Sequence, residues 1–286
     1  MVIEISLLFA LGAMLAWGFG DFFIQRCTRK IGNVEALCFI GIIGSIGLLP
    51  FVVKDISLIF NFSNIILLLF LGILAFVIAL TNFEALKKGK ISVIDVILEF
   101  ELPVTVILGF IFFKESLSSL QFVIISFIFL GTILIATKSF KHLKLRIEKG
   151  VYLALITAVG LGVINFLTGF SAREITPIIA VWFPWTLFSV FCLIYIGKRE
   201  GFNRFIKNGI KFKWIVLAMG IFDTLAWVFY AFAVSQNEIS ITTAITESYP
   251  AIALFLGIKF NKEKIKWHQY LGAVLALVLS FVLVVV

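Results

Sequence analysis

The chain has 286 residues, of which 62% are hydrophobic and only 14% are charged, and its net charge is +8. A mean hydropathy of +1.14 leaves too little polar surface to enclose a water-soluble globule, which indicates an integral membrane protein. Its apolar segments are about 18 to 23 residues long, the length that a helix needs to cross a bilayer.

Ten such segments are predicted, five in each half. In the first half they cover 4–25, 34–53, 64–86, 91–113 and 119–137, and in the second half 150–171, 177–196, 214–234, 239–259 and 267–286. The first segment has no basic leader and no small-residue cleavage site, so we expect it to stay in the protein as a span. The predicted fold class is therefore an all-α integral membrane protein with ten transmembrane helices.

The second half repeats the first at a constant offset of 148 residues. The matching pairs are Gly12 and Gly160, Gly72 and Gly220, Ala85 and Ala233, Glu99 and Glu247, Gly109 and Gly257, Glu115 and Glu263, and Gln121 and Gln269. Because five is an odd number of spans, the second unit must insert upside down relative to the first. We place the two inverted five-helix repeats at 1–145 and 146–286.

The basic residues support this inversion. With alternating connections on opposite sides, 21 of the 24 Lys and Arg residues fall at one end of the bundle and 3 at the other. The positive-inside rule places the richer end in the cytoplasm and both termini outside. These charges are expected to meet lipid headgroups, and nucleic acid is not an expected partner.

The longest connector of the second half, 197–213, carries apolar residues at helical spacing among its basic ones. They are Phe202, Phe205, Ile206 and Ile210. This pattern predicts a short helix that lies flat at the headgroups.

Acidic residues at membrane depth are the main indication of function, because burying a charge there costs several kcal/mol. The fourth span contains Asp95, Glu99 and Glu101. At 100° per residue, Asp95, Glu99 and Pro103 share one face, whereas Glu101 points to the opposite face. We therefore expect Asp95 and Glu99, but not Glu101, to line a solute pathway.

The ninth span repeats this stripe with Glu247 and Pro250. Pro103 and Pro250 each remove a backbone donor just beyond a glutamate, which frees carbonyl groups and breaks the helix near the point of solute binding. Glu99 and Glu247 are thus expected at equivalent depth, where a carboxyl group could load and release a proton. The alternative is that they form interhelical hydrogen bonds that only fix packing.

The eighth span places Asp223, Trp227 and Tyr230 on one face, where they could bind a planar, cationic or zwitterionic solute. Packing of the two aromatic rings is an equal alternative. Three further candidates lie within spans and are expected to line the pathway: Trp17, Asn82 and Asn165. Asp21 and Glu84 lie near predicted span ends, which favours interfacial pairing with neighbouring basic residues, while Glu115 and Glu263 are expected to be helix-boundary or gating residues.

Enzymatic activity is not expected. Both histidines, His142 and His268, lie in connectors, and the three cysteines are scattered without metal-ligand spacing. The sequence has no glycine-rich phosphate loop, so we expect no cofactor, no metal and no ATP-driven transport.

The chain resembles the drug/metabolite transporter superfamily, specifically its ten-helix EamA-like members. The resemblance rests on the run 16–20 (AWGFG), on Glu99 to Pro103 with Gly109, Lys114-Glu115, Gln121 and Gly131, and on Glu247 to Pro250 with Gly257, Lys262-Glu263, Gln269 and Gly272. It implies two inverted repeats around a central cavity, secondary transport of small metabolites, often efflux of amino acids, and termini inside the cell. That last implication is opposite to the charge distribution.

The sequence therefore predicts a multi-pass transporter of the cell membrane, a monomer or homodimer, that exports small cationic or zwitterionic metabolites such as amino acids by alternating access. Coupling to protons is a hypothesis that follows from the buried carboxyl groups. The alternatives are an uncoupled facilitator and a non-transporting or lipid-handling membrane protein.

Overall fold

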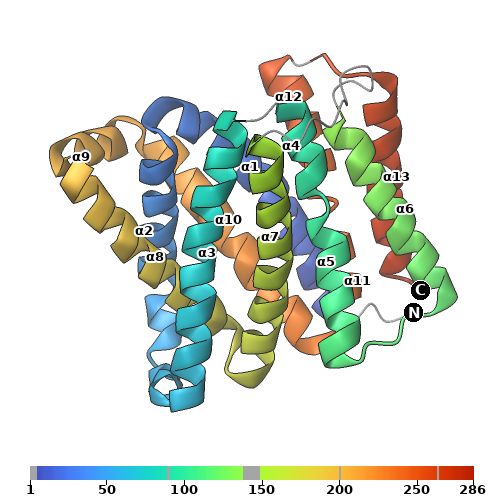
Figure 1. Cartoon of the computed structure of the whole chain (residues 1–286), viewed down its shortest axis with the longest axis horizontal. Helices are drawn as coiled ribbons and strands as arrows, with labels where there is room; N and C mark the ends of the chain where they lie inside the picture. Colours follow the sequence, from blue (N-terminus) through green and yellow to red (C-terminus); the bar gives the residue numbers. More distant parts are fainter. Residues whose placement is uncertain (1–4, 89–90, 138–148, 200, 263) are drawn as a thin grey trace.

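The computed structural model describes residues 5–88, 91–137, 149–199, 201–262 and 264–286, and all regular structure within these ranges is helical. The helices lie side by side in a single elongated bundle (Figure 1). In the described ranges, nine helical stretches are long and apolar enough to cross a membrane, and the last apolar helix is slightly shorter, at 17 residues. The predicted all-α membrane fold is confirmed.

The helices follow the predicted spans closely. In the first half they are α1 (Ile5–Ile31), α2 (Asn33–Val52), η1 (Ile56–Phe60), α3 (Phe62–Lys88), α4 (Ile91–Leu98), α5 (Glu101–Leu108), η2 (Gly109–Phe113) and α6 (Ser119–Ala136). In the second half they are α7 (Lys149–Glu174), α8 (Pro177–Arg199), α9 (Phe202–Lys211), α10 (Lys213–Gln236), α11 (Ile239–Thr246), α12 (Tyr249–Asn261) and α13 (Trp267–Leu283). Helix α9 occupies the connector for which a short interfacial helix was predicted.

The main packing contacts join the two halves. Helix α1 packs along α10, α3 along α7, α2 along α8, and α6 along α13. At the 148-residue offset α1 corresponds to α7 and α10 to α3, so the α1–α10 pair and the α3–α7 pair are equivalent. The α2–α8 and α6–α13 pairs each join a helix to its own counterpart, as a pseudo-two-fold axis requires. The α6–α13 crossing is close because Gly131 and Gly272 face each other; a Cβ added at Gly272 would lie 2.5 Å from the Gly131 carbonyl oxygen.

The fourth and ninth spans are each broken at the same position of the repeat. Helices α4 and α5 meet at 99–100, and α11 and α12 meet at 247–248. Pro103 and Pro250 follow these breaks and cannot donate to the carbonyl groups four residues earlier. At the first break Leu102 N–H donates instead to the Glu99 carbonyl, at 3.3 Å, which tightens the turn.

The two ends of the bundle differ in charge. Helix α9 and the C-terminal ends of α1, α3, α8 and α12 lie at the upper end in Figure 1, and these segments hold most of the described basic residues. Helix α1 begins and α13 ends at the opposite, lower end.

Candidate functional site

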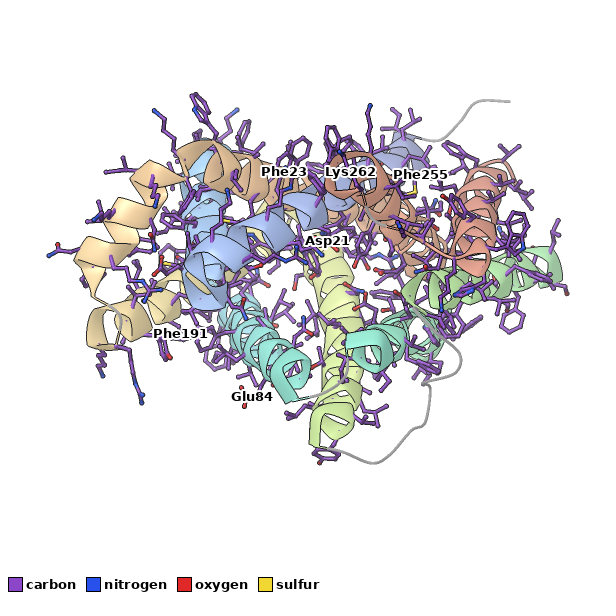
Figure 2. All side chains as sticks on the ribbon, turned by 90° about the horizontal axis from the view of Figure 1, so that it is seen from above. Asp21, Phe23, Glu84, Phe191, Phe255 and Lys262 are labelled. Carbon is purple, nitrogen blue, oxygen red and sulfur yellow. The ribbon has the colours of Figure 1, made fainter. Side chains whose placement is uncertain are left out.

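A cavity of about 650 Å³ lies between the two halves. Six of its lining residues bear on its chemistry: Asp21 of α1, Asn82 of α3, Glu99 and Glu101 at the α4–α5 break, and Tyr249 and Pro250 of α12. Lys264 and Lys266, from the α12–α13 connection, also line it, so its mouth lies at the basic-rich end. Viewed from that end, Asp21 is near the middle of the bundle, whereas Glu84 is at its edge (Figure 2).

Three acidic residues line this cavity. Asp21, Glu99 and Glu101 all belong to the first half of the chain. Glu101 is hydrogen-bonded to Glu247 of the second half, whose side chain is only 6% exposed. Ionised carboxylates can only accept hydrogen bonds, so two carboxyl groups at this separation can share a proton. Glu101 lines the cavity, whereas Glu247 lies behind it and is not among the lining residues.

The expectation that Glu101 faces away from Glu99 is wrong, because both side chains line the cavity. The helical projection assumed one continuous helix through this span. The break at 99–100 resets the helical phase, so residues on its two sides no longer follow 100° per residue. The signal that could have revealed this was Pro103, whose effect on phase the projection ignored.

Asp21 is the second acidic residue that sequence reasoning placed differently. It was expected near a span end, in interfacial pairing, but α1 continues to Ile31 and Asp21 lines the cavity well inside the helix. The charged residues that follow it, Arg26, Arg29 and Lys30, lie on the last turns of the same helix and made the span appear shorter.

Glu99, Asn82 and Pro250 line the cavity, and Pro103 follows the break. That this cavity is the solute pathway stays a prediction. Asp95 belongs to α4, but its side chain lies outside the described part of the structure, as does Glu263.

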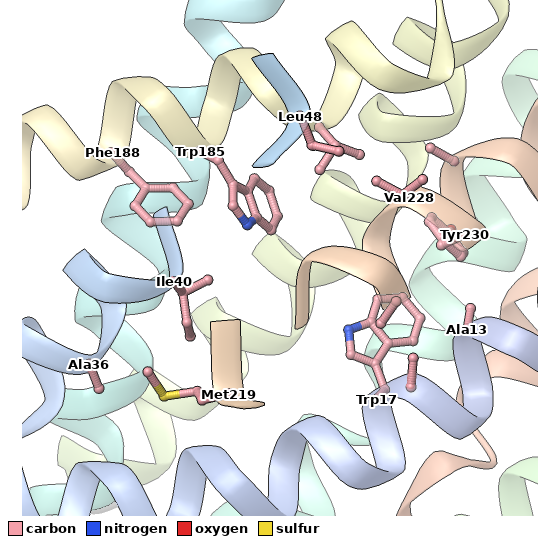
Figure 3. Packing of buried hydrophobic residues seen from close by; sticks show 14 of the residues in the cluster. Ala13, Trp17, Ala36, Ile40, Leu48, Trp185, Phe188, Met219, Val228 and Tyr230 are labelled. Carbon is pink, nitrogen blue, oxygen red and sulfur yellow. The ribbon is translucent and has the colours of Figure 1, made fainter. Parts of the chain in front are cut away.

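The aromatic candidates form a packed cluster. Trp17 lies 5.1 Å from Trp227, 5.5 Å from Tyr230 and 6.1 Å from Tyr249, measured between ring centroids. The Tyr230 hydroxyl is fully buried, 2.9 Å from the Thr243 hydroxyl and 3.5 Å from the Asn165 carbonyl oxygen. Of these rings, only Tyr249 lines the cavity. Figure 3 shows Trp17 and Tyr230 packed among neighbouring apolar side chains.

Asp223 lies apart from the cavity lining. Its side chain, on α10, is 8% exposed and faces Trp185 of α8, within the packed interior of the bundle. Asp223 and Trp227 lie one turn apart on α10, and neither lines the cavity. Asp21, on α1, does line it.

The other end of the bundle is closed by a set of contacts that we call the latch, made of Glu115, Arg173, Ile239 and Ser240. The Glu115 carboxylate accepts from the backbone N–H of Ile239 at 2.5 Å, from that of Ser240 at 3.1 Å, and from the Ser240 hydroxyl at 2.5 Å. Helix α11 has no cap from its own N-cap residue. A carboxylate of the first repeat thus satisfies the orphan donors and the positive end of a helix in the second.

Arg173 extends the latch. Its guanidinium donates to the carbonyl oxygens of Val234 at 2.8 Å and Asn237 at 2.7 Å, lies 3.7 Å from Glu115, and stacks 3.9 Å above the Phe113 ring. It therefore ties the end of α10 to the end of η2. The gating role expected for Glu115 has a definite geometry here, since this side chain crosses from one repeat to the other.

Within the described residues, no group of three or more His, Cys, Asp or Glu side chains is arranged to hold a metal ion. What the site can do, on its own residues, is bind a cationic group among carboxylates and hold a proton between two of them.

Comparisons with known proteins agree with this architecture. The model of the EamA-like transporter family matches the chain twice, at residues 4–137 and 148–285. One solved structure, described only as a crystal structure of a protein, superposes with a TM-score of 0.77 over 97% of this chain and 95% of its own, at 14% sequence identity. At that identity the likeness shows the fold alone. A search of curated proteins gives no match.

Proposed function

Because the chain belongs to the EamA-like transporter family, we propose that it exports small cationic or zwitterionic metabolites, such as amino acids, across the cell membrane in exchange for protons. The family makes it a multi-pass membrane transporter of the drug/metabolite type. What we add as a proposal is the class of solute, the direction of transport and the coupling to protons.

One observation carries the choice of solute. The described cavity lining places Asp21, Glu99 and Glu101 around one volume of about 650 Å³, and its lysines, Lys264 and Lys266, lie at the mouth. An amine or ammonium group is favoured among carboxylates, and a sugar phosphate is disfavoured. Tyr249 adds an aromatic surface against which such a cation can lie.

The Glu101–Glu247 pair supports proton exchange. It joins the two repeats at the level of the helix breaks, where broken helices in inverted-repeat transporters hold substrates and coupling ions. A cation that enters beside Glu101 competes electrostatically with the shared proton, so solute and proton occupy the site in turn. The positive-inside rule places the basic-rich end in the cytoplasm. Because the cavity opens at that end, the solute is proposed to enter it from the cytoplasm.

The test is solute-dependent dissipation of a pH gradient in proteoliposomes, with a panel of amino acids, polyamines, sugars and nucleosides. Wild type should dissipate the gradient with cationic or zwitterionic solutes, and Glu101→Gln and Glu247→Gln should each abolish this. Gln is nearly isosteric and retains a hydrogen bond to the remaining carboxyl group, which separates loss of the proton from loss of packing.

Glu174→Gln is the matched control, because Glu174 is an exposed acid at the end of α7, outside the cavity lining. It should transport like wild type. Equilibration of labelled solute without gradient dissipation would make the protein an uncoupled facilitator, and no flux of any solute would favour a non-transporting role.

A further inference from the structure

Helix α9 is held against the bundle by one specific set of contacts. The side chain of Glu35, on α2, is 0% exposed and lies 3.1 Å from the Arg204 guanidinium, and it accepts a hydrogen bond from the Asn208 amide at 2.8 Å. Phe205 stacks on Phe39 with ring centroids 4.2 Å apart. These contacts fix which face of α9 points inward.

The opposite face of α9 is exposed and combines two kinds of side chain. Ile206 and Ile210 are 55% and 70% exposed and lie one turn apart. Lys207 and Lys211 lie one turn apart beside them, and with Asn203 the four residues line a shallow groove of about 450 Å³ along the helix. Two apolar side chains in one row thus lie beside two cationic side chains in the next row, on a single groove.

The surroundings of this groove match a membrane interface. Phe202 is 49% exposed and Trp214, just beyond the helix, is 74% exposed, and large aromatic residues favour the level of the headgroups. Helix α9, whose residues line the groove, lies at the basic-rich end of the bundle, at its edge beside α2 and α8 (Figure 1). A partner there must present negative charge to the lysines and hydrocarbon to the isoleucines.

We propose that the outer face of α9 is a binding site for an anionic phospholipid of the leaflet at the basic-rich end. Lys207 and Lys211 contact the phosphate of the headgroup, Asn203 donates to its ester oxygens, and Ile206 and Ile210 lie against the upper acyl chains. The proposal is independent of the transported solute, because no residue of the groove lines the cavity.

The test is lipid retention by the full chain, purified in a neutral detergent and titrated with phosphatidylglycerol, and measured by native mass spectrometry. Phosphatidylcholine of the same chain length and glycerol 3-phosphate are the comparison ligands. Wild type should retain phosphatidylglycerol well above phosphatidylcholine. Free glycerol 3-phosphate should not displace it, because that ligand lacks acyl chains for the isoleucines.

In the double variant Lys207→Gln/Lys211→Gln, phosphatidylglycerol affinity should fall roughly 25-fold, since each basic residue near an anionic surface contributes about a fivefold gain. Lys54→Gln/Lys259→Gln removes the same charge from exposed sites outside α9 and should bind like wild type. Ile206→Ser/Ile210→Ser should weaken retention of phosphatidylglycerol while leaving both lysines in place.

All four α9 side chains are exposed, so these variants should elute and melt like wild type, and a melting curve checks this. Equal phosphatidylglycerol retention by the double lysine variant and its charge-matched control would overturn the proposal and leave this face to a protein partner. Equally tight binding of glycerol 3-phosphate would also overturn it, in favour of a soluble phosphate ester.

Discussion

The two ends of the bundle are built from equivalent residues of the two repeats but differ in conformation. At the closed end, Gly109 packs beneath Glu115 and Ser240, and Arg173 joins the latch. Their repeat mates at the other end, Gly257 and Gln25, line the open cavity. Among the described residues, the two repeats thus differ in conformation at these positions, and under the proposed alternating access an exchange of the two conformations would turn the cavity to the other side of the membrane.

Both repeats end their broken span with a lysine in the left-handed region, Lys114 and Lys262, each at φ 54°. The backbone turn is therefore common to both ends, so we expect the side-chain contacts of the latch to hold the conformation described here. Four predictions test this, each measured as labelling of a Thr243→Cys reporter by an impermeant maleimide added from the closed end. Thr243 is 0% exposed on α11, and the native cysteines are all buried.

The largest effect is expected for Glu115→Gln. This change removes a charge that accepts three hydrogen bonds at the start of α11, worth about 2 kcal/mol, so the reporter should be labelled roughly 30-fold faster. Glu174→Gln, at the same end, should leave labelling unchanged. If Glu115→Gln labels like wild type, the latch does not hold this end closed.

The second prediction compares two repeat mates, Gly109→Ala and Gly257→Ala. A Cβ at Gly109 would lie 2.7 Å from the Glu115 carboxylate and 3.0 Å from the Ser240 hydroxyl, which displaces the latch. Overpacking of this kind costs about 1.5 kcal/mol, so labelling should rise roughly tenfold. Gly257 lines the cavity, and its alanine variant should not raise labelling. Equal effects of the two variants would contradict the proposed asymmetry.

A smaller rise is expected for Arg173→Gln. The variant loses the bridge from Glu115 to the Val234 and Asn237 carbonyl groups, but Glu115 keeps its bonds to α11. A loss of about 1 kcal/mol corresponds to roughly fivefold faster labelling. Arg173→Lys should restore only part of it, because lysine lacks the planar fork that reaches both carbonyl groups. Full rescue by lysine would show that charge alone is sufficient.

The smallest effect concerns pH. Partial burial, and then the negative charge of Glu115, raise the pKa of Glu238 above its ordinary value of 4.5, against weaker opposing effects of the Ser116 backbone and Arg173. The closed state therefore binds this proton more tightly than a state in which Glu238 faces water. Lowering the pH from neutral toward that ordinary value should stabilise the closed state, and raising it through the higher pKa should weaken it.

Because Glu238 is only partly buried, the change in labelling should be about twofold. At each pH, the labelling rate of the reporter protein is divided by the rate of the same protein with Glu238→Gln. This ratio cancels the titration of the reporter thiol, which is the same in both. A ratio that is constant between pH 4.5 and 7 would show that protonation of Glu238 does not stabilise the closed state.

Much of the fold was predictable because membrane insertion constrains sequence strongly. The apolar helices, the repeat and a short helix at Phe202–Lys211 follow from hydropathy, charge and the 148-residue offset. Within the described residues the structure has nine helical stretches long enough to span, a shorter tenth apolar helix and α9. The breaks near Glu99 and Glu247 also follow, because Pro103 and Pro250 each lack a backbone donor.

The composition of the site was less predictable. Helical projection requires an unbroken helix, so it failed for Glu101, which lies beyond the break from Glu99. It also requires correct helix ends, and basic residues in the last turns of α1 made Asp21 appear interfacial. Trp227 and Tyr230 were placed on one face of their helix, but that Trp17 of α1 packs against both of them depends on contacts between the repeats.

The sequence alone determined that this chain spans a membrane as two inverted repeats with paired glutamates at their broken helices, since apolar length, loop charge and proline act locally. Only the tertiary structure decided which carboxyl groups meet and which end is closed. The Glu101–Glu247 contact and the capping of α11 by Glu115 both join residues more than a hundred positions apart, and local sequence signals do not specify contacts over that separation.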